Sequence, residues 1–94
     1  MNNNQNNSEI INVIDVRTPG EFISGHVDGS INIPLNELMD NIDKLKGMEG
    51  HIILCCASGG RSGSALYSLR QLGFNNVSNG GPWYEVQNSL SNNR

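Results

Sequence analysis

The sequence predicts an α/β domain in which a small, mostly parallel sheet is flanked by helices. Short apolar runs rich in β-branched residues alternate along the chain with segments of helical periodicity, and this alternation is typical of parallel sheets with helical connections. A chain of 94 residues has room for one domain. We expect residues 1–8 to form a disordered, Asn-rich tail and residues 9–94 to form the domain.

The first strand is predicted over residues 10–16, a nearly continuous apolar run of the kind found in strands buried on both faces. A short helix should follow. Thr18 is suited to its N-cap, Pro19 to its first position, and Gly25 to its end.

A second short strand is predicted at residues 31–33, where isoleucines alternate with polar residues before Pro34. Residues 35–45 then show apolar side chains at three- and four-residue spacing, which predicts one amphipathic helix. We expect its apolar positions to be in the core: Leu35, Leu38, Met39, Ile42 and Leu45.

The central strand is predicted at residues 52–55 and a helix at residues 62–72. A loop of small residues connects them, and it begins at Cys56. Val77 marks a last short strand, a Gly-Gly-Pro turn follows, and residues 83–90 are predicted to form a closing helix.

The loop at Cys56 carries the most informative chemistry. A Gly-rich loop between a strand and a helix can direct its N–H groups at one point, where the helix N-terminus adds partial positive charge. Gly59 and Gly60 supply the conformational freedom, and Arg61 adds a cation suited to an oxyanion. We therefore expect Cys56 to be a reactive thiol with a lowered pKa.

Three motifs together resemble the rhodanese superfamily. Residues 14–17 (IDVR) and 19–34 (PGEFISGHVDGSINIP) resemble its first signature, residues 56–62 (CASGGRS) resemble its active-site loop, and residues 80–83 (GGPW) resemble its closing motif. The pattern is similar to that of the short single-domain rhodaneses of the phage-shock type. The resemblance implies one rhodanese domain in a minimal version that lacks the usual N-terminal strand and helix.

The resemblance also implies a thiosulfate sulfurtransferase. Cys56 would take a sulfane sulfur from thiosulfate or another persulfide donor, hold it as a persulfide, and pass it to cyanide or to a thiol such as that of thioredoxin. Asp15 and Arg17 would support the structure, and neither a metal nor a cofactor is implied. The loop that would bind the persulfide or an anion consists of Ala57, Ser58, Gly59, Gly60, Arg61 and Ser62.

Two alternatives remain open. Counted from Cys55, the loop has the Cys-x5-Arg-Ser spacing of tyrosine phosphatases and related arsenate reductases. Such enzymes need a general acid, and no motif singles out one of the aspartates. The other alternative is a non-catalytic rhodanese-like binding module, against which the presence of Cys56 argues.

Composition argues against several other classes. The net charge of −3 and the pI of about 5.1 disfavour nucleic acid or an anionic membrane as a partner. No apolar run approaches the roughly 18 residues of a membrane span, and residues 1–8 do not resemble a secretory signal. The adjacent Cys55 and Cys56 fit neither a disulfide framework nor a zinc site. We expect a cytoplasmic monomer.

Overall fold

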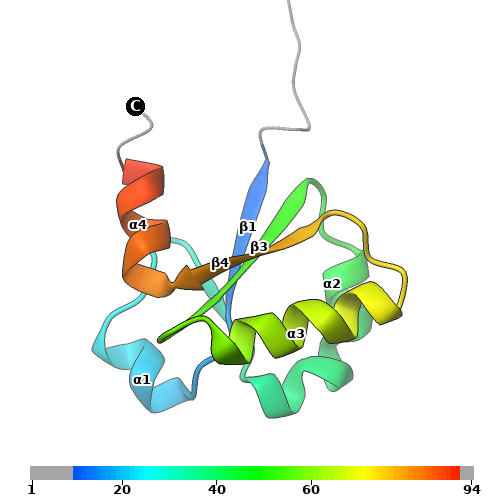
Figure 1. Ribbon diagram of the computed structural model, residues 1–94, viewed down its shortest axis with the longest axis horizontal. Helices are drawn as coiled ribbons and strands as arrows, with labels where there is room; N and C mark the ends of the chain where they lie inside the picture. The colour runs from blue at the N-terminus through cyan, green and yellow to red at the C-terminus, as the bar shows by residue number, and fades with distance from the viewer. Residues whose placement is uncertain (1–9, 92–94) are drawn as a thin grey trace, which may run out of the picture.

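The computed structural model describes residues 10–91, so the predicted tail at residues 1–8 lies outside the described part. Four strands form one sheet in the order β2-β1-β3-β4, and every neighbouring pair is parallel (Figure 1). The predicted α/β class with a parallel sheet is confirmed. The strands are β1 (Ile11–Asp15), β2 (Ile31–Asn32), β3 (His51–Cys56) and β4 (Val77–Pro82).

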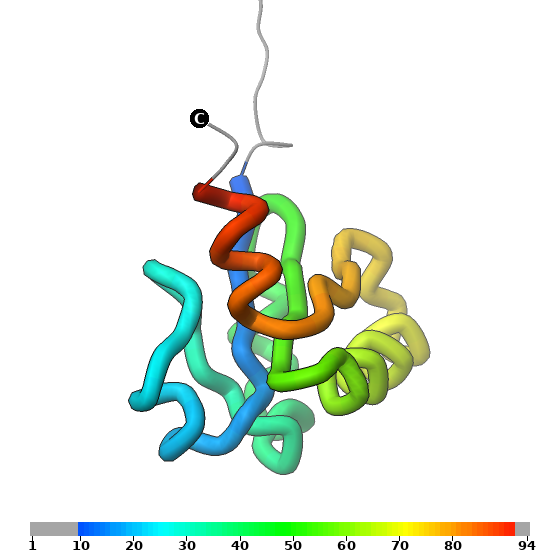
Figure 2. The backbone as a smooth tube through the Cα atoms, turned by 60° about the vertical axis from the view of Figure 1, so that its left-hand side comes forward, coloured from blue at the N-terminus to red at the C-terminus, as the bar shows by residue number. Residues whose placement is uncertain are grey.

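The helical segments are α1 (Pro19–Ser24), the 3-10 helix η2 (Leu35–Asn41), α2 (Ile42–Lys46), α3 (Gly60–Gln71) and α4 (Trp83–Ser91). Helices cover both faces of the sheet, since α3 packs on one face and α4 on the other. Figure 2 shows α3 on one side of the strands and the segment that follows α1 on the other.

The core is divided into two clusters by the alternation of side chains along β3. Ile52, Leu54 and Cys56 belong to the larger cluster, which includes buried side chains of η2, α2 and α3. Cys55 belongs to the smaller cluster on the opposite face, which contains Val86 of α4. Successive side chains of a strand point to opposite faces, so the two adjacent cysteines face different halves of the core.

The start of α1 follows the sequence prediction closely. Thr18 is the N-cap, and its hydroxyl accepts a hydrogen bond from the Glu21 N–H at 3.3 Å. The Glu21 carboxylate accepts one in return from the Thr18 N–H at 3.0 Å, which completes a capping box. The helix ends at Gly25, as predicted.

The prediction of one amphipathic helix over residues 35–45 is wrong, because a 3-10 helix precedes a short α-helix there. A 3-10 helix has three residues per turn, which places Leu35, Leu38 and Asn41 in line. Met39 is then turned outward. Leu38 is 1% exposed and Met39 is 58% exposed, so the expectation that Met39 lies in the core is also wrong.

The predicted Gly-Gly-Pro turn belongs instead to β4, which continues to Pro82. The pairing with β3 is irregular at this point, since Leu54 is opposite Asn79 while Cys55 is opposite Gly81. Gly80 is therefore an additional residue in β4 that has no partner residue in β3. A Cβ atom there would lie 2.6 Å from Val86 Cγ2, so α4 packs against β4 at a distance that only glycine allows.

Candidate active site

The β3–α3 loop surrounds the sulfur of Cys56. Cys56 is the last residue of β3 and is only 1% exposed. Its Sγ accepts hydrogen bonds from the Gly59 N–H at 3.0 Å and the Ser62 N–H at 3.4 Å, and the Ser62 Oγ lies 3.3 Å away. Gly59 has a φ of +103°, a left-handed conformation that favours glycine. The loop therefore directs backbone donors at one sulfur atom, as the sequence predicted.

These donors lower the pKa of the Cys56 thiol. Burial alone raises it, but the hydroxyl and N–H of Ser62 and the N–H groups of Gly59 and Ser58 stabilise the thiolate more strongly, and the pKa falls to about 7. At neutral pH more of the Cys56 thiol is therefore ionised than of a free cysteine. A buried thiolate held by fixed donors is a prepared nucleophile.

Cys55 is in the opposite situation. It is fully buried among Val13, Val27 and Val86. Burial and then the nearby charge of Asp15 raise the pKa of its thiol to about 12. Cys55 is thus a neutral core side chain that faces away from the loop.

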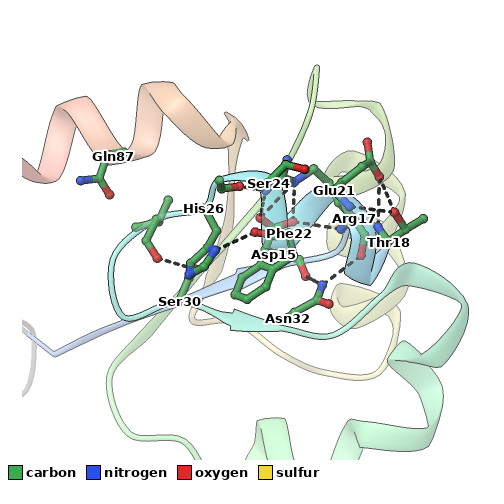
Figure 3. A network of polar contacts seen from close by, with 12 residues as sticks. Asp15, Arg17, Thr18, Glu21, Phe22, Ser24, His26, Ser30, Asn32 and Gln87 are labelled. Carbon is green, nitrogen blue, oxygen red and sulfur yellow. Dashed lines mark hydrogen bonds and ion pairs between the residues drawn. The ribbon is translucent and has the colours of Figure 1, made fainter.

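The Asp15–Arg17 pair connects three elements. The Arg17 guanidinium donates to Asp15 at 2.7 Å and to the carbonyl of Gly25 at 2.6 Å, and its Cζ lies 5.1 Å from the ring centroid of Trp83. Figure 3 shows this pair together with Asn32, which donates to the carbonyls of both residues at 3.0 and 2.9 Å. The contacts join the end of β1 to the end of α1 and the start of α4, an arrangement suited to structural support.

Arg61 is paired with a carboxylate. Its two terminal nitrogens donate to the oxygens of Glu21 at 2.8 and 3.0 Å. The Arg61 hydrogen bonds, followed by the Thr18 N–H, lower the pKa of Glu21 to about 2. The sequence singled out Arg61 as a cation for an oxyanion. The structure shows that much of its charge is compensated by Glu21, a residue in the first turn of α1 that the sequence did not single out.

Asn79 is a second residue of the site that the sequence reasoning missed. Its Oδ1 accepts from the Ser62 hydroxyl at 2.6 Å and from the Gly81 N–H at 2.9 Å, while its Nδ2 donates to the Gly59 carbonyl at 3.2 Å. One signal could have found it, since asparagine is disfavoured in strands and this one lies between Val77 and the glycine pair.

Neither histidine has a place in this loop. His26 stacks on Phe22 with 3.8 Å between ring centroids, and its Nδ1 lies 2.7 Å from the Phe22 carbonyl (Figure 3). His51 lies at the start of β3, and its Nε2 is 2.8 Å from Ser78 Oγ.

Among residues 10–91, the acidic, histidine and cysteine side chains form no group of three or more that could hold a metal ion. Within the same range no helix is long and apolar enough to cross a membrane.

Comparison with known proteins yields a consistent set of relatives. The family model described as "Rhodanese-like domain" matches residues 1–81. The thiosulfate sulfurtransferase PspE of Escherichia coli is 36% identical over 69 residues, which cover 72% of this chain and 66% of that protein. The chloroplastic thiosulfate sulfurtransferase 16 of Arabidopsis thaliana is 37% identical over 75 residues, which cover 68% of this chain and 62% of that protein.

A solved structure agrees with these matches. A rhodanese with anions from E. coli superposes with a TM-score of 0.74 at 32% identity, covering 81% of this chain and 91% of that one. The chain spans slightly less than two thirds of the length of the two curated relatives, at 66% and 62%.

Proposed function

The chain belongs to the rhodanese family, and we propose that it is a sulfurtransferase that carries a sulfane sulfur as a persulfide on Cys56. One observation carries the proposal. The Cys56 sulfur is buried under a loop that donates hydrogen bonds to it at 3.0 to 3.4 Å, and these donors lower its pKa to about 7. The names of the relatives, thiosulfate sulfurtransferases of bacteria and plants, support the same reaction class.

The first half-reaction loads the enzyme. The Cys56 thiolate attacks the outer sulfur of thiosulfate, a new S–S bond forms, the S–S bond of thiosulfate breaks, and sulfite leaves with the bonding electron pair. The product is a Cys56 persulfide anion, so the charge balances without a proton donor. Another persulfide can serve as donor in the same way, with its thiolate as leaving group.

The second half-reaction empties the enzyme. Cyanide or a thiolate, for example that of thioredoxin, attacks the outer persulfide sulfur and leaves as thiocyanate or as a new persulfide. Cys56 is then again a thiolate. The outer sulfur would extend beyond the buried Sγ toward Ala57, Ser58 and Gly60, all of which are exposed. There the loop N–H groups between Ala57 and Ser62 would stabilise its negative charge.

A phosphatase that uses Cys55 fits the geometry poorly. That thiol has its pKa raised to about 12 and faces the side of the sheet opposite α3. A nucleophile there would meet neither the loop donors nor the N-terminus of α3. A binding module that does not use Cys56 would have no need for a thiol with a pKa of about 7.

Intact-protein mass spectrometry tests the proposal directly. The protein is incubated with thiosulfate as wild type, Cys56→Ser and Cys55→Ser, and hydrolysis of a phosphate monoester is measured alongside. We expect wild type and Cys55→Ser to gain the mass of one sulfur, which cyanide removes, while Cys56→Ser gains nothing. If no donor adds sulfur and phosphate ester hydrolysis depends on Cys55, the proposal fails and the phosphatase alternative replaces it.

A further inference from the structure

Asn79 is the side chain that connects the donors around the Cys56 sulfur to the neighbouring strand. It lies on β4, one position before the irregular pairing at Gly80, and is opposite Leu54 of the larger core cluster. Parallel strands keep paired residues on the same face, which places the Asn79 side chain on the face that α3 covers. A strand residue thereby reaches the first turn of α3.

Two of the groups that surround the sulfur are held by this one amide. The Ser62 hydroxyl donates to Asn79 Oδ1 at 2.6 Å while its oxygen lies 3.3 Å from Cys56 Sγ. Gly59, whose N–H donates to the sulfur at 3.0 Å, has its carbonyl bonded to Asn79 Nδ2 at 3.2 Å. Displacement of Asn79 would therefore loosen both donors together.

The single hydroxyl proton of Ser62 makes the arrangement responsive to the state of Cys56. When Cys56 is a neutral thiol, its S–H can donate to Ser62 Oγ while the hydroxyl donates to Asn79. When Cys56 is a thiolate, the hydroxyl proton can turn to the sulfur. Asn79 Oδ1 then still accepts from the Gly81 N–H at 2.9 Å, so no acceptor is left without a partner.

We propose that Asn79 is a positioning residue that orients Ser62 and Gly59 around Cys56 and thereby favours the thiolate form. The inference rests on the proposed function, since it assigns Asn79 a part in preparing the nucleophile. Asn79 itself carries no charge. The charged or titratable groups whose fields reach Cys56 are Arg61, which is paired with Glu21, and Cys55 on the other face.

The test is the pH dependence of Cys56 alkylation by iodoacetamide, with the product assigned to Cys55 or Cys56 by fragment mass spectrometry. We expect Asn79→Ala to move the midpoint upward by about one pH unit. Asn79→Leu keeps the approximate volume of the side chain and adds no charge, but it removes the amide oxygen and nitrogen that hold Ser62 and Gly59, so its midpoint should move upward by a similar amount. This second variant carries the test if Asn79→Ala is poorly folded.

Asn76→Ala is the matched control. Asn76 precedes β4, and its Nδ2 donates to the Gly50 carbonyl at 2.6 Å, far along the strand from the loop. Its removal should leave the alkylation midpoint unchanged. A midpoint in both Asn79 variants equal to that of wild type would overturn the proposal.

A double-mutant cycle shows whether Asn79 acts through Ser62. If it does, the shift caused by Asn79→Ala should fall to less than half in a Ser62→Ala background. An equal shift in both backgrounds would contradict this route. No sulfur donor is present in these measurements, so a protein that fails to load sulfur would still give the Asn79 result, and the two proposals can fail separately.

Discussion

Cys55 and Cys56 are neighbours in the chain and almost equally buried, at 0% and 1% exposure, yet their thiols differ sharply. The pKa of Cys55 is raised to about 12, whereas that of Cys56 is lowered to about 7. Burial opposes ionisation in both. The difference is that the Cys56 sulfur accepts hydrogen bonds from a loop, while Cys55 lies among valines. The pKa of each thiol here follows the local donors, and exposure does not predict it.

The strand explains how adjacent residues come to differ so much. Side chains of β3 alternate between the two core clusters, and only one face continues into the N-terminus of α3. A shift of one residue in the β3 register would turn each thiol to the opposite face of the sheet. The pairing of Ile14 with Leu54 and of Asp15 with Cys55 therefore determines which cysteine lies under the loop.

Alkylation of wild-type protein offers the largest expected contrast between the two thiols. Thiolate forms as pH rises through the pKa, so Cys56 should react with a midpoint near pH 7 and Cys55 only when the fold opens. At pH 7 nearly all of the thiolate should therefore be on Cys56. Rates measured by peptide mass spectrometry between pH 5 and 9 check this. A Cys56 midpoint near the ordinary thiol value of about 8.5 would contradict it.

Leu38 and Met39 of η2 form a second pair of neighbours with opposite environments. Leu38→Ala should lower the free energy of unfolding by about 3 kcal/mol, because it empties a site that is 1% exposed. Met39→Gln should change it by less than about 0.5 kcal/mol, since Met39 is 58% exposed. Urea unfolding of both variants measures the difference. Similar losses in the two variants would contradict the outward position of Met39.

Local signals in the sequence predicted much of this fold. Thr18, Pro19 and Gly25 marked the limits of α1, and the small-residue loop after Cys56 marked the start of α3. These features depend on residues a few positions apart. The sequence pattern of residues 35–45 was ambiguous, because apolar residues at three-residue spacing fit a 3-10 helix as well as one face of an α-helix.

The interactions that the sequence did not predict join residues far apart in the chain. Arg61 pairs with Glu21 across 40 positions, and Asn79 bonds Ser62 across 17. No local periodicity reports such pairs, because they form only when the strand order brings β4 and α1 to the same loop. Glu21 also forms the capping box with Thr18, and this local interaction gives no indication of the contact between Glu21 and Arg61.

Gly59 and Gly73 provide a third contrast, between two glycines that both have a left-handed backbone. Gly59→Ala places a side chain at a φ of +103°, a strain of about 1–2 kcal/mol that the loop can relieve by moving the Gly59 N–H away from the sulfur. We expect the rate of sulfur loading from thiosulfate to fall about tenfold or more. Gly73→Ala is the control, because Gly73 also has a left-handed φ, of +95°, but follows the C-terminal end of α3, away from the loop at Cys56. Equal rates in the two variants would show that the Gly59 donor does not matter.

The smallest expected effect concerns the charge at the loop. Glu21→Gln keeps an oxygen for the capping box but removes the carboxylate that compensates Arg61. Both side chains of this pair are 37% exposed, so solvent already screens their interaction. We therefore expect only a several-fold gain in kcat/KM for the dianion thiosulfate.

The charge of Glu21 can be removed only by substitution. Because Arg61 lowers the pKa of Glu21 to about 2, the carboxylate stays ionised at working pH. Steady-state kinetics with thiosulfate, a dianion, and with an organic persulfide, which carries at most one negative charge, separate the causes. A larger gain for thiosulfate would show that Glu21 limits the use of Arg61 for anionic donors, whereas equal changes for both donors would mean that the substitution only alters the shape of the loop.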